Sequence, residues 1–286
     1  MPKLKHTFKT DILFKMLFVK HPELLKRLTA HLLKISYESI TQFEIRNPEM
    51  PPEDMDSKFC RLDILMMVNG QQTILEVQVE DEGDYPERTL FYWASAYTNS
   101  LPVAGKYINL PRTIIINIIN FSLFENCTEF HSEFQLLEKT RKILLTDKQE
   151  LHFFELQKLP ENIDKNDLLQ LWLALFKANT DEELKMIDDM GVSEISEAVT
   201  VYHSVTLSPE FREMERIRLS NEASALYNAE QRGREKGREE GREEGREEER
   251  KETSLNIARK LKNMGKMTIA EIAESTGLST EEIEQL

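Results

Sequence analysis

Two carboxylates and an amide are spaced so that they could meet on one face of a small sheet. Asp63 lies in the apolar stretch FCRLDILMMV, and Glu76 and Gln78 lie in the stretch QQTILEVQV that follows it. Asn69 and Gly70 join the two stretches. Asn-Gly between apolar runs is a strong hairpin signal, because both turn positions need a positive φ. The sequence therefore predicts two antiparallel strands joined by a tight turn.

The turn also sets the register of the two strands. If Val68 faces Gln71, then Asp63 faces Glu76, and the two carboxylates share one face of the sheet. Opposed residues have Cβ atoms roughly 4.5–5.5 Å apart, and like charges at that distance repel. Apolar residues on both faces predict burial, so a cation is needed to offset the repulsion. Mg²⁺ is commonly held by one or two carboxylates, water and phosphate. The alternative is an exposed hairpin whose charges lie in water.

At these residues the chain resembles the Rpn family of recombination-promoting nucleases, which are also described as transposases and belong to the PD-(D/E)xK nucleases. The resemblance extends in order over residues 7–125. The stretches on which it rests are KTDILFKMLF at 9–18, RLDIL at 61–65, ILEVQ at 74–78, ERTLFYW at 87–93 and GKY at 105–107.

The resemblance implies an α/β fold with a restriction-endonuclease-like core, in which helices flank a mixed sheet, and a helical C-terminal extension. It also implies metal-dependent cleavage of DNA phosphodiester bonds, with Asp63, Glu76 and Gln78 as the catalytic residues. Gln78 stands where the family pattern has Lys, so it could orient a water molecule but brings no positive charge. The implied metal ligands are Asp63, Glu76, the Val77 carbonyl and Asp11, although Asp11 could equally be an ordinary first-turn acid. Mg²⁺ is the expected ion, with Mn²⁺ or Ca²⁺ as alternatives.

A formal charge of −14 does not favour binding to nucleic acid by simple charge neutralisation, which depends on Lys and Arg. Local basic residues could still contact phosphate. Arg88 and Tyr92 are four residues apart and share a helix face, but packing and a salt bridge would explain them as well. The candidate contacts to DNA or phosphate are Lys9, Lys15, Arg61, Arg88 and Tyr92.

Elements around the hairpin would position these residues. We expect an amphipathic helix over 10–20, a second helix from Pro22, a strand within 40–46, a helix from 84 to about 101, and a strand over 112–121 that is buried on both faces. This gives the order α-β-β-β-α-β for the nuclease core. We expect a nuclease-like domain over 1–160 and a helical region over 161–229.

The C-terminal part begins with a repeat. Glycines recur at every fourth residue, at Gly233, Gly237, Gly241 and Gly245, among Arg and Glu. The stretch 230–252 could be a solvated charged linker, or the glycines could allow close approach of a second helix. Residues 253–286 predict a small helical module with two capping boxes. Part of it resembles a helix-turn-helix, but its second helix is acidic, so we interpret it as a docking or dimerisation element.

Composition limits the class of protein. At 286 residues and 40% hydrophobic, the chain can bury a large core. Two cysteines give no disulfide framework, and the N-terminus lacks the apolar run of a signal peptide, so the cytoplasm is the expected compartment. We expect DNA as a partner, a homodimer through the C-terminal region and no membrane. The alternative function is a nuclease-like fold that acts as a non-catalytic DNA- or protein-binding assembly module.

Overall fold

The computed structural model describes residues 3–46, 63–101 and 104–286. Contacts divide the chain into two compact units, Met1–Glu215 and Arg216–Leu286. In the described residues, no helix is long and apolar enough to cross a membrane. The predicted boundaries at residues 160, 229 and 252 stay predictions.

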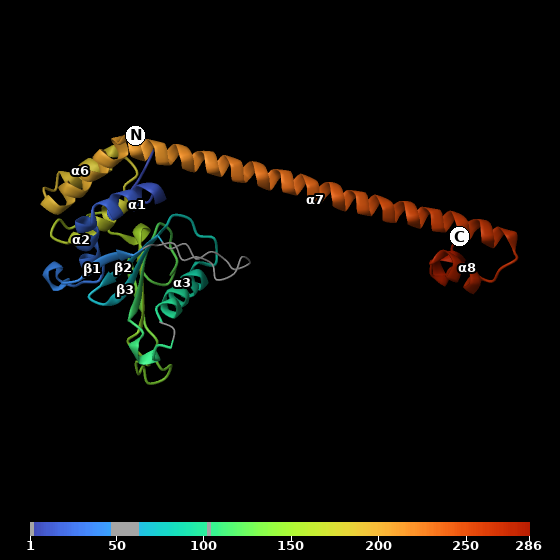
Figure 1. Cartoon of the computed structure of the whole chain (residues 1–286), viewed down its shortest axis with the longest axis horizontal. Helices are drawn as coiled ribbons and strands as arrows, with labels where there is room; N and C mark the ends of the chain where they lie inside the picture. The colour runs from blue at the N-terminus through green and yellow to red at the C-terminus, as the bar shows by residue number, and fades with distance from the viewer. Residues whose placement is uncertain (1–2, 47–62, 102–103) are drawn as a thin grey trace. The chain divides into compact units, whose positions relative to one another are not determined.

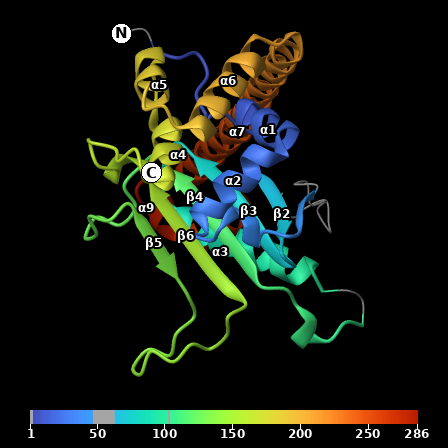
Figure 2. The same cartoon turned by 90° about the vertical axis from the view of Figure 1, so that its left-hand side faces the viewer.

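The first unit is built on one mixed sheet of six strands in the order β1-β2-β3-β4-β6-β5 (Figures 1 and 2). Antiparallel pairing joins β1 to β2, β2 to β3 and β5 to β6, whereas β3, β4 and β6 are parallel. The strands are β1 (Phe43–Arg46), β2 (Ile64–Val68), β3 (Gln71–Gln78), β4 (Thr113–Ile119), β5 (His131–Phe134) and β6 (Gln149–Glu155).

Helices cover both faces of this sheet. The helices α1, α2, α4 and α6 pack on one face, and α3 packs on the other, as the two groups of buried side chains show (Figure 1). The helices of this unit are α1 (Asp11–Lys20), α2 (Pro22–Leu32), α3 (Tyr85–Asn99), α4 (Leu168–Lys177), α5 (Asp181–Asp188) and α6 (Ser193–Leu207), with short 3₁₀ turns η1 (Tyr37–Ser39), η2 (Tyr107–Asn109) and η3 (Leu156–Lys158). The expected α/β fold with a mixed sheet is confirmed.

The predicted hairpin forms with the predicted register. Asn69 and Gly70 have φ values of 49° and 77°, and Val68 is paired with Gln71. The pairing continues to Ile64 opposite Leu75. The strand expected over 112–121 forms as β4, and all seven of its residues are buried, because a central parallel strand is covered by helices on both faces.

A chain of polar side chains lies at the sheet edge formed by β5 and β6, on the α2 side. His152 Nε2 lies 2.7 Å from Glu150 Oε1, and His131 Nε2 lies 3.0 Å from His152 Nδ1. Arg112 donates to the other oxygen of Glu150. Burial opposes ionisation of Glu150, but the bonds from His152 and Arg112 outweigh it and lower its pKa to about 2. Burial lowers the pKa of His131 to about 4.

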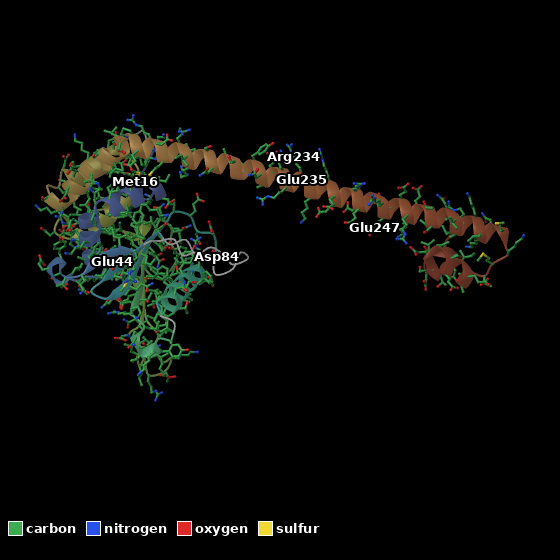
Figure 3. The ribbon with its side chains drawn as sticks, in the orientation of Figure 1. Met16, Glu44, Asp84, Arg234, Glu235 and Glu247 are labelled. Carbon is green, nitrogen blue, oxygen red and sulfur yellow. The ribbon has the colours of Figure 1, made fainter. Side chains whose placement is uncertain are left out.

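The second unit contains most of the long helix α7 (Pro209–Met264), together with α8 (Ile269–Thr276) and α9 (Thr280–Glu284). Both predicted capping boxes form, at Thr268 with Glu271 and at Ser279 with Glu282. Ala258, Ile272, Leu278 and Ile283 make a small core of their own. Along α7 the side chains of Arg234, Glu235 and Glu247 extend from the helix (Figure 3).

Candidate active site

Asp63 and Glu76 lie together at the end of the β2–β3 hairpin. The backbone N–H of Asp63 donates to Glu76 Oε1 at 3.0 Å, and the backbone N–H of Val77 donates to Asp63 Oδ2 at 2.9 Å. These crossed bonds lie directly after the last paired residues of the two strands, Ile64 and Leu75. The predicted juxtaposition of the two acids is therefore present in the fold.

Both carboxylates resist ionisation. Burial raises the pKa of Glu76 well above its usual range, and the nearby Asp63 charge adds to the rise. Burial also raises the pKa of Asp63, although the Val77 N–H and the Lys15 ammonium oppose that rise. When two carboxyls lie close together away from water, one of them tends to stay protonated unless a nearby cation neutralises the negative charge. The Lys15 ammonium supplies part of that neutralisation.

The Val77 carbonyl lies on the correct side to join the two acids. In a strand, the N–H and C=O of one residue point to the same neighbouring strand. The Val77 N–H is directed to Asp63, and the next carbonyl, that of Gln78, turns the other way and accepts from Asn120 N–H. The Val77 carbonyl therefore faces the Asp63 side, as a backbone ligand would require.

Helix α1 brings an ammonium group to the pair. Lys15 Nζ lies 2.7 Å from Asp11 Oδ1 and 3.5 Å from Asp63 Oδ1. The Lys15 ammonium therefore contacts both Asp11 and Asp63 and connects Asp11 to the site. Among the described residues, no group of three or more His, Cys, Asp or Glu side chains is placed to hold a metal ion. Two carboxylates and a carbonyl are nonetheless a hard-oxygen set of the kind that Mg²⁺ accepts when water and phosphate complete it.

The remaining predicted residues are placed in different ways. Arg88 lies close enough for its charge to act on Glu76, and Tyr92 packs partly buried on the α3 side of the sheet. Gln78 is next to the pair, but its amide donates to the Glu80 carbonyl at 2.9 Å. Arg61 lies outside the described residues.

Lys9 is placed elsewhere. Its side chain is buried, and its Nζ donates to the carbonyls of Phe176 and Lys177 and to Asn179 Oδ1. It therefore satisfies the C-terminal carbonyls of α4, a common role for lysine at a helix end. Burial lowers its pKa to about 8. With its protons directed into the protein, Lys9 is not positioned to contact DNA phosphate, contrary to the expectation from sequence.

Two residues next to the acids were missed by the sequence reasoning. Asn117 of β4 is paired with Glu76 and is 1% exposed, and the Tyr85 hydroxyl donates to its Oδ1 at 2.9 Å. A signal for Asn117 was available, because its amide interrupts the isoleucines of the run TIIINII. A polar side chain in a strand buried on both faces needs a partner.

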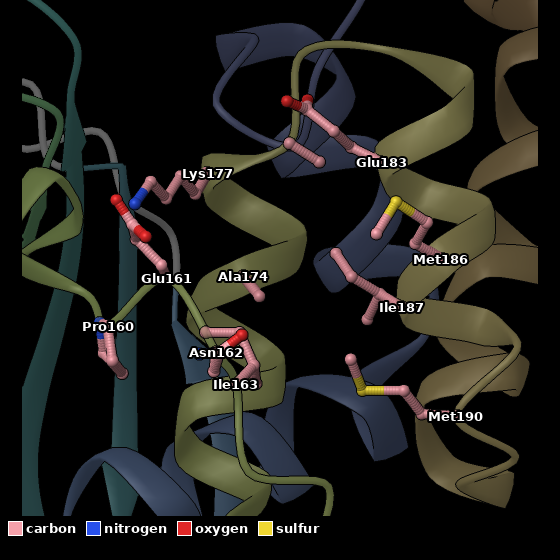
Figure 4. Close-up of a pocket in the computed structure, with 11 residues that line it drawn as sticks. Pro160, Glu161, Asn162, Ile163, Ala174, Lys177, Glu183, Met186, Ile187 and Met190 are labelled. Carbon is pink, nitrogen blue, oxygen red and sulfur yellow. The ribbon is translucent and has the colours of Figure 1, made fainter.

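An apolar pocket of about 340 Å³ lies between the segment before α4 and helix α5 (Figure 4). Ile163, Met186, Ile187 and Met190 line it, with Lys177 and Glu183 at its edge. None of the predicted site residues is among those that line it. The candidate chemistry therefore lies at the hairpin and not at this pocket.

The chain matches one protein family. The family is described as PD-(D/E)XK nuclease family transposase, and the match covers residues 8–229. It thus extends beyond the sheet through α4, α5 and α6 into the first part of α7. No curated protein and no solved structure matches the chain.

Proposed function

Because the chain belongs to the PD-(D/E)XK nuclease family transposases, we propose that it is a divalent-metal-dependent DNA endonuclease that hydrolyses phosphodiester bonds. The observation that supports this most directly is the pair Asp63 and Glu76, which are bound to each other's strands through crossed hydrogen bonds. Burial raises the pKa of both carboxyls, and the Asp63 charge raises that of Glu76 further. In a nuclease of this family, a bound divalent cation would offset the free-energy cost of ionising both carboxyls.

Asp63, Glu76 and the Val77 carbonyl would hold the ion, and Mg²⁺ is the ion we propose, since all three donors are oxygen. A bound divalent ion supplies Lewis-acid polarisation of a phosphate oxygen and favours ionisation of water. Asp11, which is bonded to Lys15, would act by orienting that lysine or by joining the ion if the lysine moves.

Lys15 is proposed to supply the positive charge that Gln78 cannot. Its ammonium lies 3.5 Å from Asp63, and its charge also acts on Glu76. A cation at this position can stabilise negative charge on a phosphate as it develops in the transition state. Gln78 is free to exchange its bond to the exposed Glu80 carbonyl for one to a water molecule.

Arg88 and Tyr92 are proposed to contact the DNA, since they lie on α3, which covers the same face of the sheet as the acids. A second copy of the chain is the other proposed partner, because exposed apolar side chains such as Leu226 and Tyr227 lie on α7. Two joined active sites would suit cleavage of both strands of a duplex. A role in DNA recombination or mobility follows the description of the family.

The experiment is cleavage of supercoiled plasmid by the purified full-length protein with Mg²⁺, Mn²⁺ or Ca²⁺, and with EDTA. The matched controls are Asp63→Asn and Glu76→Gln, which keep the shape of the side chains and remove their charge. We expect nicking or linearisation that requires metal and is lost in both variants. Equal cleavage by wild type and both variants would show a contaminating nuclease, and absence of cleavage with every metal would contradict the proposal.

A second function is favoured by two features of the site. Lys15 already bridges Asp11 and Asp63, and Gln78 replaces the expected lysine. A site neutralised in this way would suit a non-catalytic module that binds DNA or protein. DNA binding that is unchanged by metal and by Glu76→Gln, together with no cleavage, would support this alternative.

A further inference from the structure

Tyr85 is fixed in position by contacts on several sides. It is the first residue of α3 and is 4% exposed. Its hydroxyl donates to Asn117 Oδ1 at 2.9 Å. Phe121 and Phe153 meet its ring at centroid distances of 5.6 and 6.3 Å, in edge-on geometry. The ring is therefore held against the sheet.

The acceptor of this bond is also fixed. Asn117 donates its Nδ2 proton to the His152 carbonyl at 2.9 Å, and the Thr89 hydroxyl lies 3.4 Å from its Oδ1. Asn117 is paired with Glu76 across β3 and β4. The first turn of α3 is thus tied to the strand next to the candidate catalytic acid.

Arg88 lies over the Tyr85 ring. Its guanidinium carbon is 4.9 Å from the ring centroid, and its Nη1 is 3.0 Å from the carboxylate of Glu82. A guanidinium over an aromatic face is attracted by the ring quadrupole and loses orientational freedom. Tyr85 therefore covers one face of the Arg88 guanidinium. The guanidinium Nη1 binds the carboxylate of the exposed Glu82, so this edge of the group can bind an anion.

We propose that Tyr85, which is bonded to the Asn117 that pairs with Glu76, is a positioning residue that holds the Arg88 guanidinium on the Glu76 side of the sheet, ready for a DNA phosphate. This rests on the proposed nuclease function for the identity of the anion. Tyr85 does not touch the phosphate itself. It acts through Arg88, and the ring matters more than the hydroxyl for this role, because the ring is the surface on which the guanidinium lies.

The test compares Tyr85→Met, which keeps an apolar side chain but removes the aromatic face, with the matched control Tyr85→Phe. Binding of a short duplex to the full-length protein is measured with Ca²⁺, by fluorescence anisotropy. Since a cation–π contact is worth about 0.5–2 kcal/mol, Tyr85→Met should weaken binding by roughly twofold to thirtyfold, and Tyr85→Phe should weaken it by less than Tyr85→Met does.

A double-mutant cycle separates positioning from a general loss of structure. In the Arg88→Ala background, Tyr85→Met should have no further effect on binding, because the group it positions is absent. Equal losses from Tyr85→Met with and without Arg88 would overturn the proposal. So would a loss in Tyr85→Phe as large as that in Tyr85→Met.

A measurement independent of DNA tests the same contact. The Arg88 Nε–H resonance, assigned by its disappearance in Arg88→Lys, should show a ring-current shift in wild type and Tyr85→Phe and lose it in Tyr85→Met. An unshifted resonance in wild type overturns the proposal even if Tyr85→Met fails to fold. If the resonance is shifted but wild-type protein neither binds nor cleaves DNA, the proposed function fails and the positioning of Arg88 stands.

Discussion

The backbone N–H of Asp63 donates to the side chain of Glu76 at 3.0 Å, so one candidate catalytic acid helps to fix the other. The Val77 N–H returns a bond to Asp63. These two bonds hold both carboxylates at the open end of the hairpin. Such preorganisation reduces the entropy that must be lost on binding.

Replacing either acid by its amide should abolish metal-dependent cleavage, with a loss of about 100-fold or more, since a lost electrostatic contact at a reacting phosphate commonly costs that much. Glu76→Gln should keep its acceptor for the Asp63 N–H. The metal-free variant should therefore melt at or above the wild-type temperature at pH 8. A large destabilisation in both amide variants would identify the acids as structural instead.

The same pair predicts a pH dependence. Because the folded-state pKa values of Asp63 and Glu76 are raised, the metal-free folded chain binds more protons than the unfolded chain. Their contribution to stability is fully present below the unfolded pKa values, near 4, and is lost as pH rises through the folded values. Thermal melts in EDTA should show this decline, and Glu76→Gln should reduce it. An added divalent ion should stabilise more at higher pH, because its ligands must be ionised.

Lys15→Met should lower cleavage, and Lys15→Arg should retain more of it, because the charge beside Asp63 is kept. Gln78→Lys should retain or raise activity in the wild-type background. If Lys15 and residue 78 supply the same charge, Gln78→Lys should also restore part of the activity lost in Lys15→Met. Rates measured at matched metal concentration decide this. No rescue would mean that the two positions have different roles, and Gln78→Ala controls for loss of the native amide.

The polar chain at β6 predicts sensitivity to acid that is unrelated to the candidate site. His131, with a pKa of about 4, stays neutral in the fold while the unfolded chain binds a proton below about 6.5, so stability should fall as pH decreases from 6.5 to 4. Glu150, with a pKa of about 2, should add a further loss between 4.5 and 2. His131→Gln should reduce the fall in the free energy of unfolding between pH 6.5 and 4. Glu150→Gln should cost on the order of 2 kcal/mol at neutral pH, because it weakens the bond to the charged Arg112 guanidinium. Urea titrations across this pH range provide the measurement, and parallel curves for all three proteins would contradict the assignment.

Replacing Gly233, Gly237, Gly241 and Gly245 by Ala distinguishes the two interpretations of the repeat. An added Cβ meets no atom within 4 Å at any of them. If α7 is solvated here, each change should favour the helix by about 1 kcal/mol. If a second helix approaches along the glycines, the added methyl groups should weaken that association. Circular dichroism measures the gain in helicity, and the molar mass from light scattering measures any loss of association.

Deletion of residues 231–286 should leave a folded core, because the contacts that build the sheet unit lie within Met1–Glu215. The deletion should shift the protein toward monomer if the C-terminal region forms the dimer contact. Light scattering at tens of micromolar, a range set by ordinary affinities, compares the two lengths. A monomeric full-length protein would exclude the homodimer.

The sequence by itself determined the hairpin and its register. Asn69 and Gly70 restrict the turn, and the period of two in a strand then decides each pairing as far as Ile64 and Leu75. The capping boxes at Thr268 and Ser279 could be predicted for the same reason, because each of their bonds joins residues three apart. The core order of helices and strands followed from the same short-range patterns.

Tertiary structure decided which charged groups reach the site. Lys9 and Lys15 lie on or next to the same helix, yet Lys9 is bonded to the end of α4, more than 160 residues away in sequence, and Lys15 meets Asp63. The stacking of Arg88 on Tyr85 and the bond from Tyr85 to Asn117 likewise join separate elements. Such contacts depend on how α1, α3 and α4 pack on the sheet, and no local pattern of residues encodes that packing.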